Sequence, residues 1–248
     1  MITRSADLAS YAALASQIDT DLVLINKMQP KGSASIRSTF QPWLDADPAR
    51  HRLYMYQSCL SFGCDKVHQG NETIIYEPHS LWDGWPSYGI DQPATEQRAM
   101  GWMAYKFGVT GEYYYDSALR LQRGWKDCAV NNLDCLYASG GNGDGTLFYP
   151  GTVAPKSTIG SPGIGGIHDI PLESMRLKGI RDGREDYEFL RKVPAAQQGA
   201  AMNIVNGLYP SMSSANVTPA QIASARQSII SLIPNESVQP RRRSVRRP

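Results

Sequence analysis

Long hydrophobic runs are absent from this sequence. No stretch reaches the roughly 18 consecutive apolar residues that a membrane-spanning helix needs, so we expect no membrane partner. The first 18 residues also lack the continuous apolar core of a signal peptide, and their apolar spacing predicts an amphipathic helix over residues 7–18. The location in the cell stays open: either the protein is cytosolic, or the chain does not include the true start of its gene product.

Cysteine and histidine are scarce, with four of each. The cysteines fall into two close pairs, Cys59 with Cys64 and Cys128 with Cys135, and neither pair has the C-x-x-C spacing typical of zinc ligands. We therefore expect no metal site, and no motif indicates a cofactor. Two disulfides in loops and four free thiols remain equally open alternatives.

A broad surface of one charge is also missing. The formal charge is +2, but five arginines lie in the last eight residues, and setting those five aside leaves −3 for the rest. A mildly acidic body offers no electrostatic footprint for nucleic acid, so we expect no nucleic-acid partner. The arginine-rich end, residues 239–248, is predicted to be a disordered, solvated tail, with a localisation or nucleic-acid patch as the alternative.

What the sequence does contain is an alternation of strands and helices. Apolar and aromatic runs predict strands over Asp21–Met28, Arg52–Cys59 and Val109–Ser117, and a helix between Pro93 and Gly108 precedes the third strand. This order is typical of a parallel sheet covered by helices. A complete (β/α)8 barrel needs eight strands in about 250 residues. The predicted fold class is therefore α/β, a partial (β/α)8 barrel made of the last three βα units.

The second half of the chain adds a turn and two helices. The glycine-rich stretch GNGDGTLFYPG permits positive φ angles in a tight turn, which predicts a hairpin at 143–150. Ser174 is a candidate N-cap for a helix running to Lys192, and Thr218 followed by Pro219 begins a last helix. We accordingly divide the chain into a barrel portion, a helical extension and the tail, with bounds at 1–192, 193–238 and 239–248.

Three motifs together carry a family resemblance. QPATEQRAMGWMAYKFGVTGEYYYDSA, GNGDGTLFYPG and IPLESMRLKGIRDGREDYEFL occur in this order. Over about Ile18–Leu190 they resemble the C-terminal part of a glycoside hydrolase family 123-like catalytic domain, also catalogued as a domain of unknown function. The chain departs from the family pattern at Tyr115, where tryptophan is usual, at Gly179, where an aliphatic residue is usual, and at Arg184, which replaces an apolar residue.

The resemblance implies a retaining hexosaminidase that cleaves terminal N-acetyl-β-galactosaminides by substrate-assisted catalysis. It also implies full-length relatives that are secreted or extracytoplasmic. In the family an adjacent Asp-Glu pair on a middle strand orients the acetamide and protonates the leaving oxygen. This sequence contains no Asp-Glu dipeptide, so the catalytic strand would lie before Met1. No catalytic residue is therefore assigned, and the isolated chain is expected to be inactive.

The carboxylates of the third strand do not replace the missing pair. Glu112 and Asp116 share one face, and four residues at about 3.3 Å each place them about 13 Å apart. Paired glycosidase carboxylates lie about 5 to 9.5 Å apart. Glu112 is expected instead to anchor a hydrogen-bond network.

Aromatic residues near the strand ends are the better candidates for contacting a sugar, because active sites of these barrels lie at the carboxyl ends of the strands. The substrate-binding candidates are Tyr56, Trp85, Tyr115, Asp116 and Trp125. Strand alternation allows only one side of the Tyr113–Tyr115 run to face the barrel, and the sequence leaves open which side that is. Residues of opposite charge on the helix after Ser174 are predicted to dock it beneath the barrel, namely Arg176, Arg181, Asp182, Glu185 and Asp186.

Two functions follow as alternatives. The chain is the C-terminal portion of a glycoside hydrolase-like protein acting on N-acetylhexosamine-containing glycans, or it is a non-catalytic carbohydrate-binding or structural remnant of such a barrel. The expected partners are a glycan and an upstream N-terminal barrel segment. Three strands cannot close a barrel, so the isolated chain is expected to be poorly soluble or oligomeric.

Overall fold

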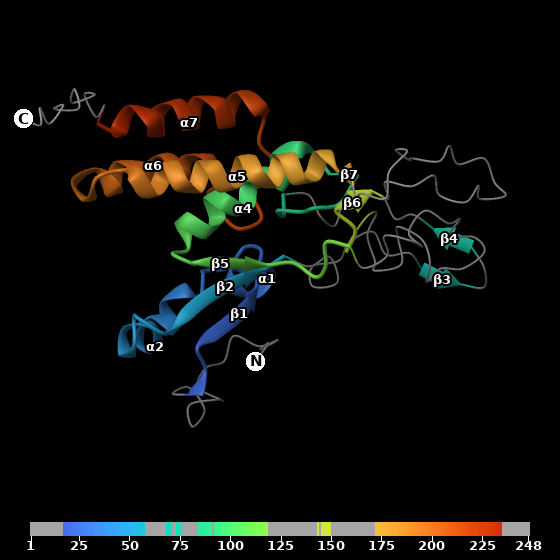
Figure 1. Cartoon of the computed structure of the whole chain (residues 1–248), viewed down its shortest axis with the longest axis horizontal. Helices are drawn as coiled ribbons and strands as arrows, with labels where there is room; N and C mark the ends of the chain where they lie inside the picture. Colours follow the sequence, from blue (N-terminus) through green and yellow to red (C-terminus); the bar gives the residue numbers. More distant parts are fainter. Residues whose placement is uncertain are drawn as a thin grey trace, which may run out of the picture.

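A small parallel sheet with helices stacked over one face forms the body of the protein (Figure 1). The computed structural model of the chain describes residues 17–57, 68–70, 73–75, 84–90, 92–118, 143, 145–149 and 172–234. The sheet has the strand order β1 (Thr20–Leu24), β2 (Arg52–Tyr56) and β5 (Gly111–Tyr113), and both neighbouring pairs are parallel. The α/β class and the three parallel strands predicted from the sequence are confirmed.

The strands are shorter than the sequence predicts. β1 stops at Leu24, and the following residues form the single helical turn α1 (Ile25–Met28). A continuous apolar run cannot distinguish a buried strand from a buried helical turn, since both Ile25 and Met28 are fully buried. Between α1 and β2 the chain forms the short helix η3 (Arg37–Phe40), followed directly by α2 (Gln41–Ala46).

The predicted helix after Pro93 is α4 (Ala94–Lys106), and Gly108 follows it with the positive φ of 58° that suits glycine at a helix end. Ser174 caps α5 (Met175–Lys192) by accepting a hydrogen bond from the Leu177 amide. Thr218 and Gln221 form a capping box at the start of α7 (Pro219–Leu232). These three helices begin where the sequence predicts.

Two features of the loops differ from the predictions. Between β2 and α4, where the sequence analysis predicts no strand, the chain contains the antiparallel pair β3 (His68–Gly70) and β4 (Thr73–Ile75). The glycine turn is present, with φ of 76° at both Gly143 and Gly145. However, the strand after it, β6 (Phe148–Tyr149), pairs with β7 (Leu172–Glu173) rather than within 143–150. The predicted local hairpin is therefore wrong in its partner strand.

An unpredicted helix, α6 (Gln198–Leu208), follows the short turn η5 (Ala195–Gln197). Its buried residues Ala201, Val205 and Leu208 have helical spacing. Gly199 and Gly207 near its ends weaken the sequence signal, because glycine costs about 1 kcal/mol relative to alanine in a helix. Figure 1 shows α4 next to the sheet, α5 and α6 above it, and α7 outermost.

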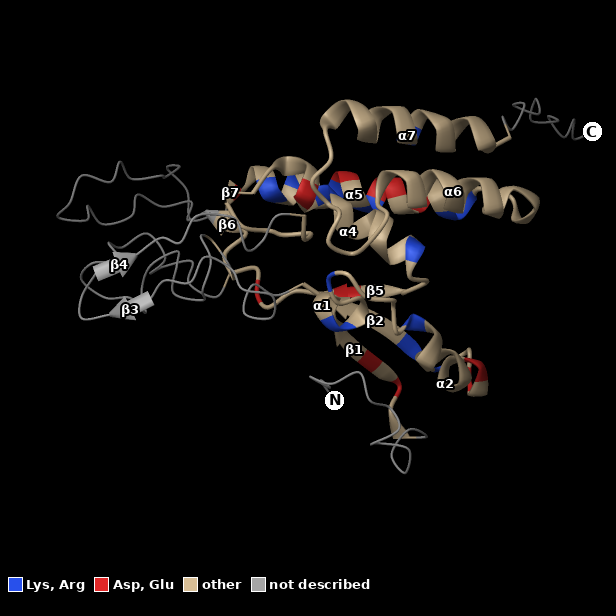
Figure 2. Ribbon diagram, turned by 180° about the vertical axis from the view of Figure 1, so that it is seen from behind, with Lys and Arg blue, Asp and Glu red and all other residues tan. Residues whose placement is uncertain are grey.

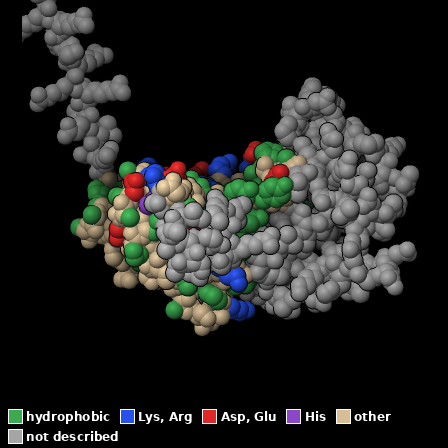
Figure 3. Space-filling view, turned by 90° about the horizontal axis from the view of Figure 1, so that it is seen from below, with side chains coloured by type: hydrophobic (Ala, Val, Ile, Leu, Met, Phe, Trp, Pro, Cys, Tyr) green, Lys and Arg blue, Asp and Glu red, His purple; other side chains and the backbone are tan. Residues whose placement is uncertain are grey.

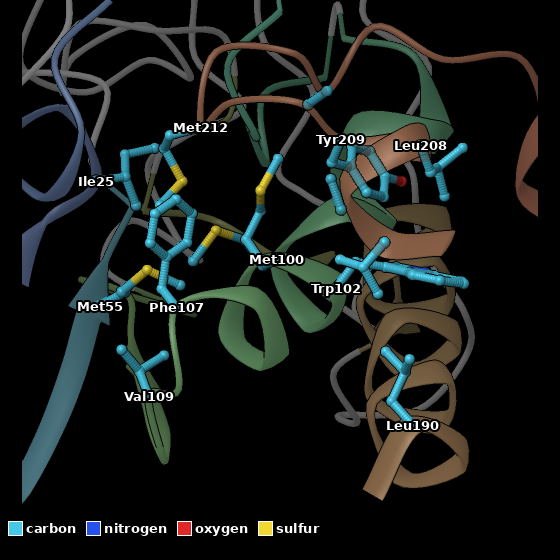
Figure 4. Packing of buried hydrophobic residues seen from close by; sticks show 14 of the residues in the cluster. Ile25, Met55, Met100, Trp102, Phe107, Val109, Leu190, Leu208, Tyr209 and Met212 are labelled. Carbon is cyan, nitrogen blue, oxygen red and sulfur yellow. The ribbon is translucent and has the colours of Figure 1, made fainter. Parts of the chain in front are cut away.

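The hydrophobic core has two connected parts, which Figure 4 shows from close by. Between the sheet and α4, the side chains of Ile25, Met55, Met100 and Phe107 meet, together with Met212 from the segment after α6. Between α4, α5 and α6, a second group packs, formed by Trp102, Leu190, Leu208 and Tyr209. α4 therefore has buried side chains facing both layers.

Glycines allow α4 and α5 to cross at very close range. A Cβ atom on Gly101 would lie 1.8 Å from the Gly183 carbonyl oxygen, and one on Gly183 would lie 2.4 Å from the Arg98 carbonyl oxygen. Gly179, one turn earlier on α5, would place a Cβ 3.1 Å from the Gln97 side chain. No larger residue fits at the first two positions without moving the helices apart.

A buried carboxylate lies beside this crossing. The Asp186 side chain is fully buried, and it accepts hydrogen bonds from Arg98 Nε at 2.5 Å, Arg98 Nη2 at 2.8 Å and Trp102 Nε1 at 2.7 Å. Arg226 of α7 lies 3.2 Å away through its Nε. One carboxylate thus contacts donors from two other helices, and the bidentate arginine and the indole fix α4 against α5.

Replacing Gly101 with alanine should destabilise the protein by about 1–3 kcal/mol or more, the cost of overpacking a close helix contact. Gly199→Ala is the matched control, because a Cβ there would meet nothing within 4 Å. It should be neutral or stabilise by up to about 1 kcal/mol, since alanine lowers the entropy cost of forming a helix. Urea unfolding of both variants measures the difference, and equal effects of the two changes would contradict the close crossing.

Replacing Asp186 with asparagine should cost about 3–5 kcal/mol, because it leaves two arginines beside a buried group that no longer carries a charge. Asp182→Asn on the same helix is the control. Asp182 pairs with Arg181 at 3.0 Å on the surface, with 39% of its side chain exposed, so solvent screens that pair and the loss should be much smaller. Free energies of unfolding in urea test this order, and a larger loss from Asp182→Asn would refute it.

Candidate functional site

Tyrosines gather at the carboxyl edge of the sheet, where parallel α/β folds place their sites. β2 and β5 both end in tyrosine, and Tyr56 and Tyr113 are paired in register with ring centroids 5.2 Å apart in an edge-to-face arrangement. Tyr113 is 36% exposed and Tyr115 is 52% exposed. The structure thus brings together two aromatic strand ends that are 57 residues apart in the chain, with an exposed third ring close in sequence.

The two faces of the sheet differ in what they carry. Side chains alternate along a strand, so Tyr54 and Tyr56 of β2 lie on the same face as Tyr113 of β5. Gly111 sits opposite Tyr54, and a Cβ there would lie 2.4 Å from the tyrosine ring. Glu112 and Met55 lie on the other face, toward α4. The sequence did not show which face of the sheet Tyr113 occupies. In the structure, its side chain points away from the helices.

Figure 3 shows the molecule from below, with hydrophobic side chains interspersed among polar ones over the described part of that face.

Tyr114 directly follows Tyr113 at the end of β5, and its side chain points to the opposite side from that of Tyr113. Its ring packs 5.1 Å from that of Tyr88, and its hydroxyl accepts a hydrogen bond from the Gly145 amide at 2.8 Å. Tyr114 therefore connects the strand end to the glycine turn.

The remaining substrate-binding candidates have separate positions. Asp116 is half-buried, and its Oδ1 accepts a hydrogen bond from the Ala118 amide at 2.5 Å. Trp85 is 5% exposed and belongs to the hydrophobic core, so its ring offers no open stacking face. Trp125 lies outside the described residues. Of the five candidates, Tyr56, Tyr115 and Asp116 lie at or just beyond the carboxyl edge.

Arg176, at the start of α5, holds two loops against this edge. Its buried guanidinium donates to the carbonyl oxygens of Tyr88 at 2.9 Å and Gly143 at 2.7 Å, and also to that of Thr146. Gly143 lies so close that a Cβ would be 2.7 Å from Ile90 and 2.8 Å from the Arg176 Nη1. The glycine turn and the loop before α4 are thus tied to one side chain.

Glu112 is enclosed on the helix face of the sheet. The Tyr88 hydroxyl donates to its Oε1, and Arg184 Nη2 donates to its Oε2 at 2.7 Å. Burial raises the pKa of the Glu112 carboxyl above its ordinary 4.5, and Arg184 and the Tyr88 hydroxyl offset part of that rise. Burial, followed by the nearby Glu112, raises the pKa of Tyr88 well above its ordinary value. Tyr88 has no distinguishing sequence pattern, and only the fold reveals its contact with Glu112.

Gln57 is a second residue that the sequence analysis missed. It directly follows Tyr56, is fully buried, and neither its amide nitrogen nor its amide oxygen has a hydrogen-bond partner among the described residues. Buried amides are nearly always hydrogen-bonded in folded proteins, so an unused pair at a sheet edge is an unusual feature.

The charged residues predicted to dock α5 fall into two groups. Asp186 and Arg176 are buried and make the contacts described above. Arg181 is exposed, pairs with Asp182 at 3.0 Å, and lies 3.7 Å from Glu185 on the same helix. These exposed pairs stay on the surface of α5. Contacts to other elements come from Asp186, Arg176 and Arg184, and Glu185 also lies 3.7 Å from Arg226 of α7.

No group of three or more potential metal ligands occurs within the part of the chain that the structure describes. Among the same residues, no helix is long and apolar enough to cross a membrane. Cys59, Cys64, Cys128 and Cys135 lie outside the described ranges, as do most of the predicted helix at 7–18 and the arginine-rich tail.

No protein-family model matches this chain, and a search of curated proteins finds no match either.

The raised pKa of Glu112 gives a testable pH dependence. Because the folded state favours the protonated carboxyl, its contribution to stability is present below the ordinary pKa and is lost as the pH rises through the folded pKa. Glu112→Gln lacks this loss, so its free energy of unfolding should rise relative to the wild type between pH 4 and the folded pKa. Urea unfolding at a series of pH values measures the difference.

Arg184→Gln provides the control for that experiment. It removes the cation that lowers the Glu112 pKa, so the loss of stability should extend to higher pH than in the wild type. A difference between Glu112→Gln and the wild type that stays constant or shrinks with rising pH would contradict the assignment.

Proposed function

We propose that this chain forms part of a (β/α)8 barrel that binds N-acetylhexosamine-containing glycans, as the C-terminal portion of a glycoside hydrolase-like protein. The observation that carries the proposal is the aromatic carboxyl edge, where Tyr56 and Tyr113 lie in contact and Tyr115 is exposed close by. The three parallel strands and the sequence motifs support the barrel.

Sugar rings have apolar faces that pack on aromatic rings and hydroxyl groups that need hydrogen-bond partners. The edge offers both kinds of group. Tyr113 and Tyr115 present exposed rings, while Asp116 lies just beyond the end of β5. Arg176 holds the neighbouring loops, which gives this edge a rigid border.

The environment of Glu112 argues against turnover by this chain. A general acid must reach the glycosidic oxygen directly or through one water molecule. Glu112 lies on the helix face and is bonded to Arg184 and Tyr88, whereas the exposed Tyr113 lies on the opposite face. It is therefore not placed to protonate a sugar held on the ring of Tyr113, which favours glycan binding without catalysis as the activity of the isolated chain.

Tyr115→Ala should weaken the binding of an N-acetylgalactosamine-terminated oligosaccharide by about 1–3 kcal/mol, the value of an aromatic stacking contact on a base. Titration calorimetry measures the affinity. Tyr115→Phe is the control, because it keeps the ring and removes only the hydroxyl, and it should retain most of the binding. Equal affinities of all three proteins would exclude Tyr115 from the site.

Turnover is tested separately with an aryl N-acetyl-β-galactosaminide. The purified 248-residue chain should release no aryl alcohol above the spontaneous rate. Robust turnover that Glu112→Gln or Asp116→Asn abolishes would overturn the non-catalytic part of the proposal and identify that carboxylate as the acid.

A further inference from the structure

A groove lies along the outer side of α5, between the residue before β5 and α7. Its volume is about 560 Å³, within the range of small-molecule sites. The side chains that matter for its chemistry are Arg184, Arg191, Lys192, Arg226, Tyr187 and Phe189. Figure 2 shows charges of both signs along α5. None of the residues that line this groove belongs to the carboxyl edge of the sheet, where Tyr56, Tyr113 and Tyr115 lie.

Basic side chains outnumber acidic ones in the groove. Five lining residues are arginine or lysine and two, Glu185 and Glu188, are acidic, so the lining carries a formal charge of +3. Arg191 and Lys192 are exposed, and neither has an acidic partner within the described residues. Their charges are therefore available to an anion that enters the groove.

Arg226 has unused hydrogen-bond donors. Its Nε lies 3.2 Å from Asp186 and its Nη2 lies 3.7 Å from Glu185, but none of its N–H groups makes a hydrogen bond among the described residues. The reason is that Arg98 and Trp102 already donate to the Asp186 carboxylate. A guanidinium has five donors, and a carboxylate, sulfate or phosphate is the group that such a fork binds best.

Arg184 also lines the groove and has unused hydrogen-bond donors. Among the described residues, only its Nη2 makes a hydrogen bond, to the buried Glu112, and 54% of its side chain is exposed. The other N–H groups of this guanidinium therefore remain accessible to a ligand.

Two aromatic rings complete the groove and hold the cations in place. The Arg226 guanidinium lies 4.9 Å from the Phe189 ring centre, and Lys192 lies 5.9 Å from the same ring. Arg191 lies 5.8 Å from the ring of Tyr187. Such cation–π contacts keep the basic groups over the rings, next to the space a ligand would fill.

We propose that this groove binds a small molecule carrying an oxyanion, either carboxylate, sulfate or phosphate. Arg226 and Arg184 hold the oxyanion, Arg191 and Lys192 add positive charge at the rim, and the ring or apolar part of the ligand packs on Tyr187 and Phe189. The site is separate from the proposed glycan-binding edge and does not depend on it.

The test compares phenyl phosphate, inorganic phosphate and phenol by titration calorimetry with the full chain, at an ionic strength held constant with chloride. Phenyl phosphate should bind most tightly, because it provides both the oxyanion and the ring, and phenol most weakly. Arg226→Gln should weaken phenyl phosphate binding at least about tenfold, as expected for loss of a charge-assisted contact.

A second variant guards against misfolding, because Arg226 also contacts the buried Asp186. Arg191→Gln combined with Lys192→Gln changes only exposed side chains, so the variant should fold normally and bind several-fold more weakly. Arg50→Gln, at a surface ion pair with Asp19, is the matched control and should bind like the wild type. Phosphate binding no stronger than that of chloride, or equal weakening by Arg50→Gln, would overturn the proposal.

Discussion

The close crossing of α4 and α5 is the contact on which the rest of the structure depends. Gly101 and Gly183 have no side chains, so the two backbones approach closely enough for Arg98 and Trp102 to reach Asp186. A buried carboxylate is costly unless its hydrogen bonds are complete, and here three donor groups of α4 complete them. The buried carboxylate therefore depends on the glycines, because the close approach of the two helices brings its hydrogen-bond donors within reach.

From this crossing, α5 contacts the loops beside the sheet edge, the sheet itself and the outer helix α7. Near its start, Arg176 binds the carbonyls of the loops beside the sheet edge. In its middle, Arg184 reaches Glu112 on the sheet. Its later turns contribute Leu190 to the core and Phe189 to the contact with Arg226 of α7. A shift of α5 would thus displace the sheet edge, the network at Glu112 and the outer helix together.

The parts of this fold that sequence could predict are those with local signals. Pro93, Ser174 and Thr218 mark helix starts through the chemistry of the first turn. Apolar and aromatic runs predict the strands, and their alternation with helices predicts a parallel sheet. The parts that failed depend on contacts made far along the chain. The partner of β6 comes from residues 172–173, and the bond from Arg176 to the Tyr88 carbonyl spans 88 residues. No local pattern encodes either of these contacts.

The residues of the candidate site also fall into those that local sequence signals predict and those that only tertiary contacts reveal. The sequence identified the tyrosines near the strand ends, because the carboxyl ends of parallel strands all lie at one edge of the sheet. It could not exclude Trp85, since only tertiary packing buries that ring, and it had no signal for Tyr88 or Gln57. It also gave no reason for glycine at position 179, where a Cβ would lie 3.1 Å from the Gln97 side chain.

The alternation of side chains along β5 places two consecutive residues with different chemistry on opposite faces of the sheet. Glu112 and Tyr113 are neighbours, yet one faces the helices and the other faces away from them. The carboxylate is thereby enclosed with Tyr88 and Arg184, where it links the sheet to α5, while the ring at the next position stays exposed. A residue that could act as an acid is used in binding the layers together, and the residues left to meet a ligand at this edge are aromatic and polar. That division supports the proposal that this edge binds a ligand without catalysing a reaction.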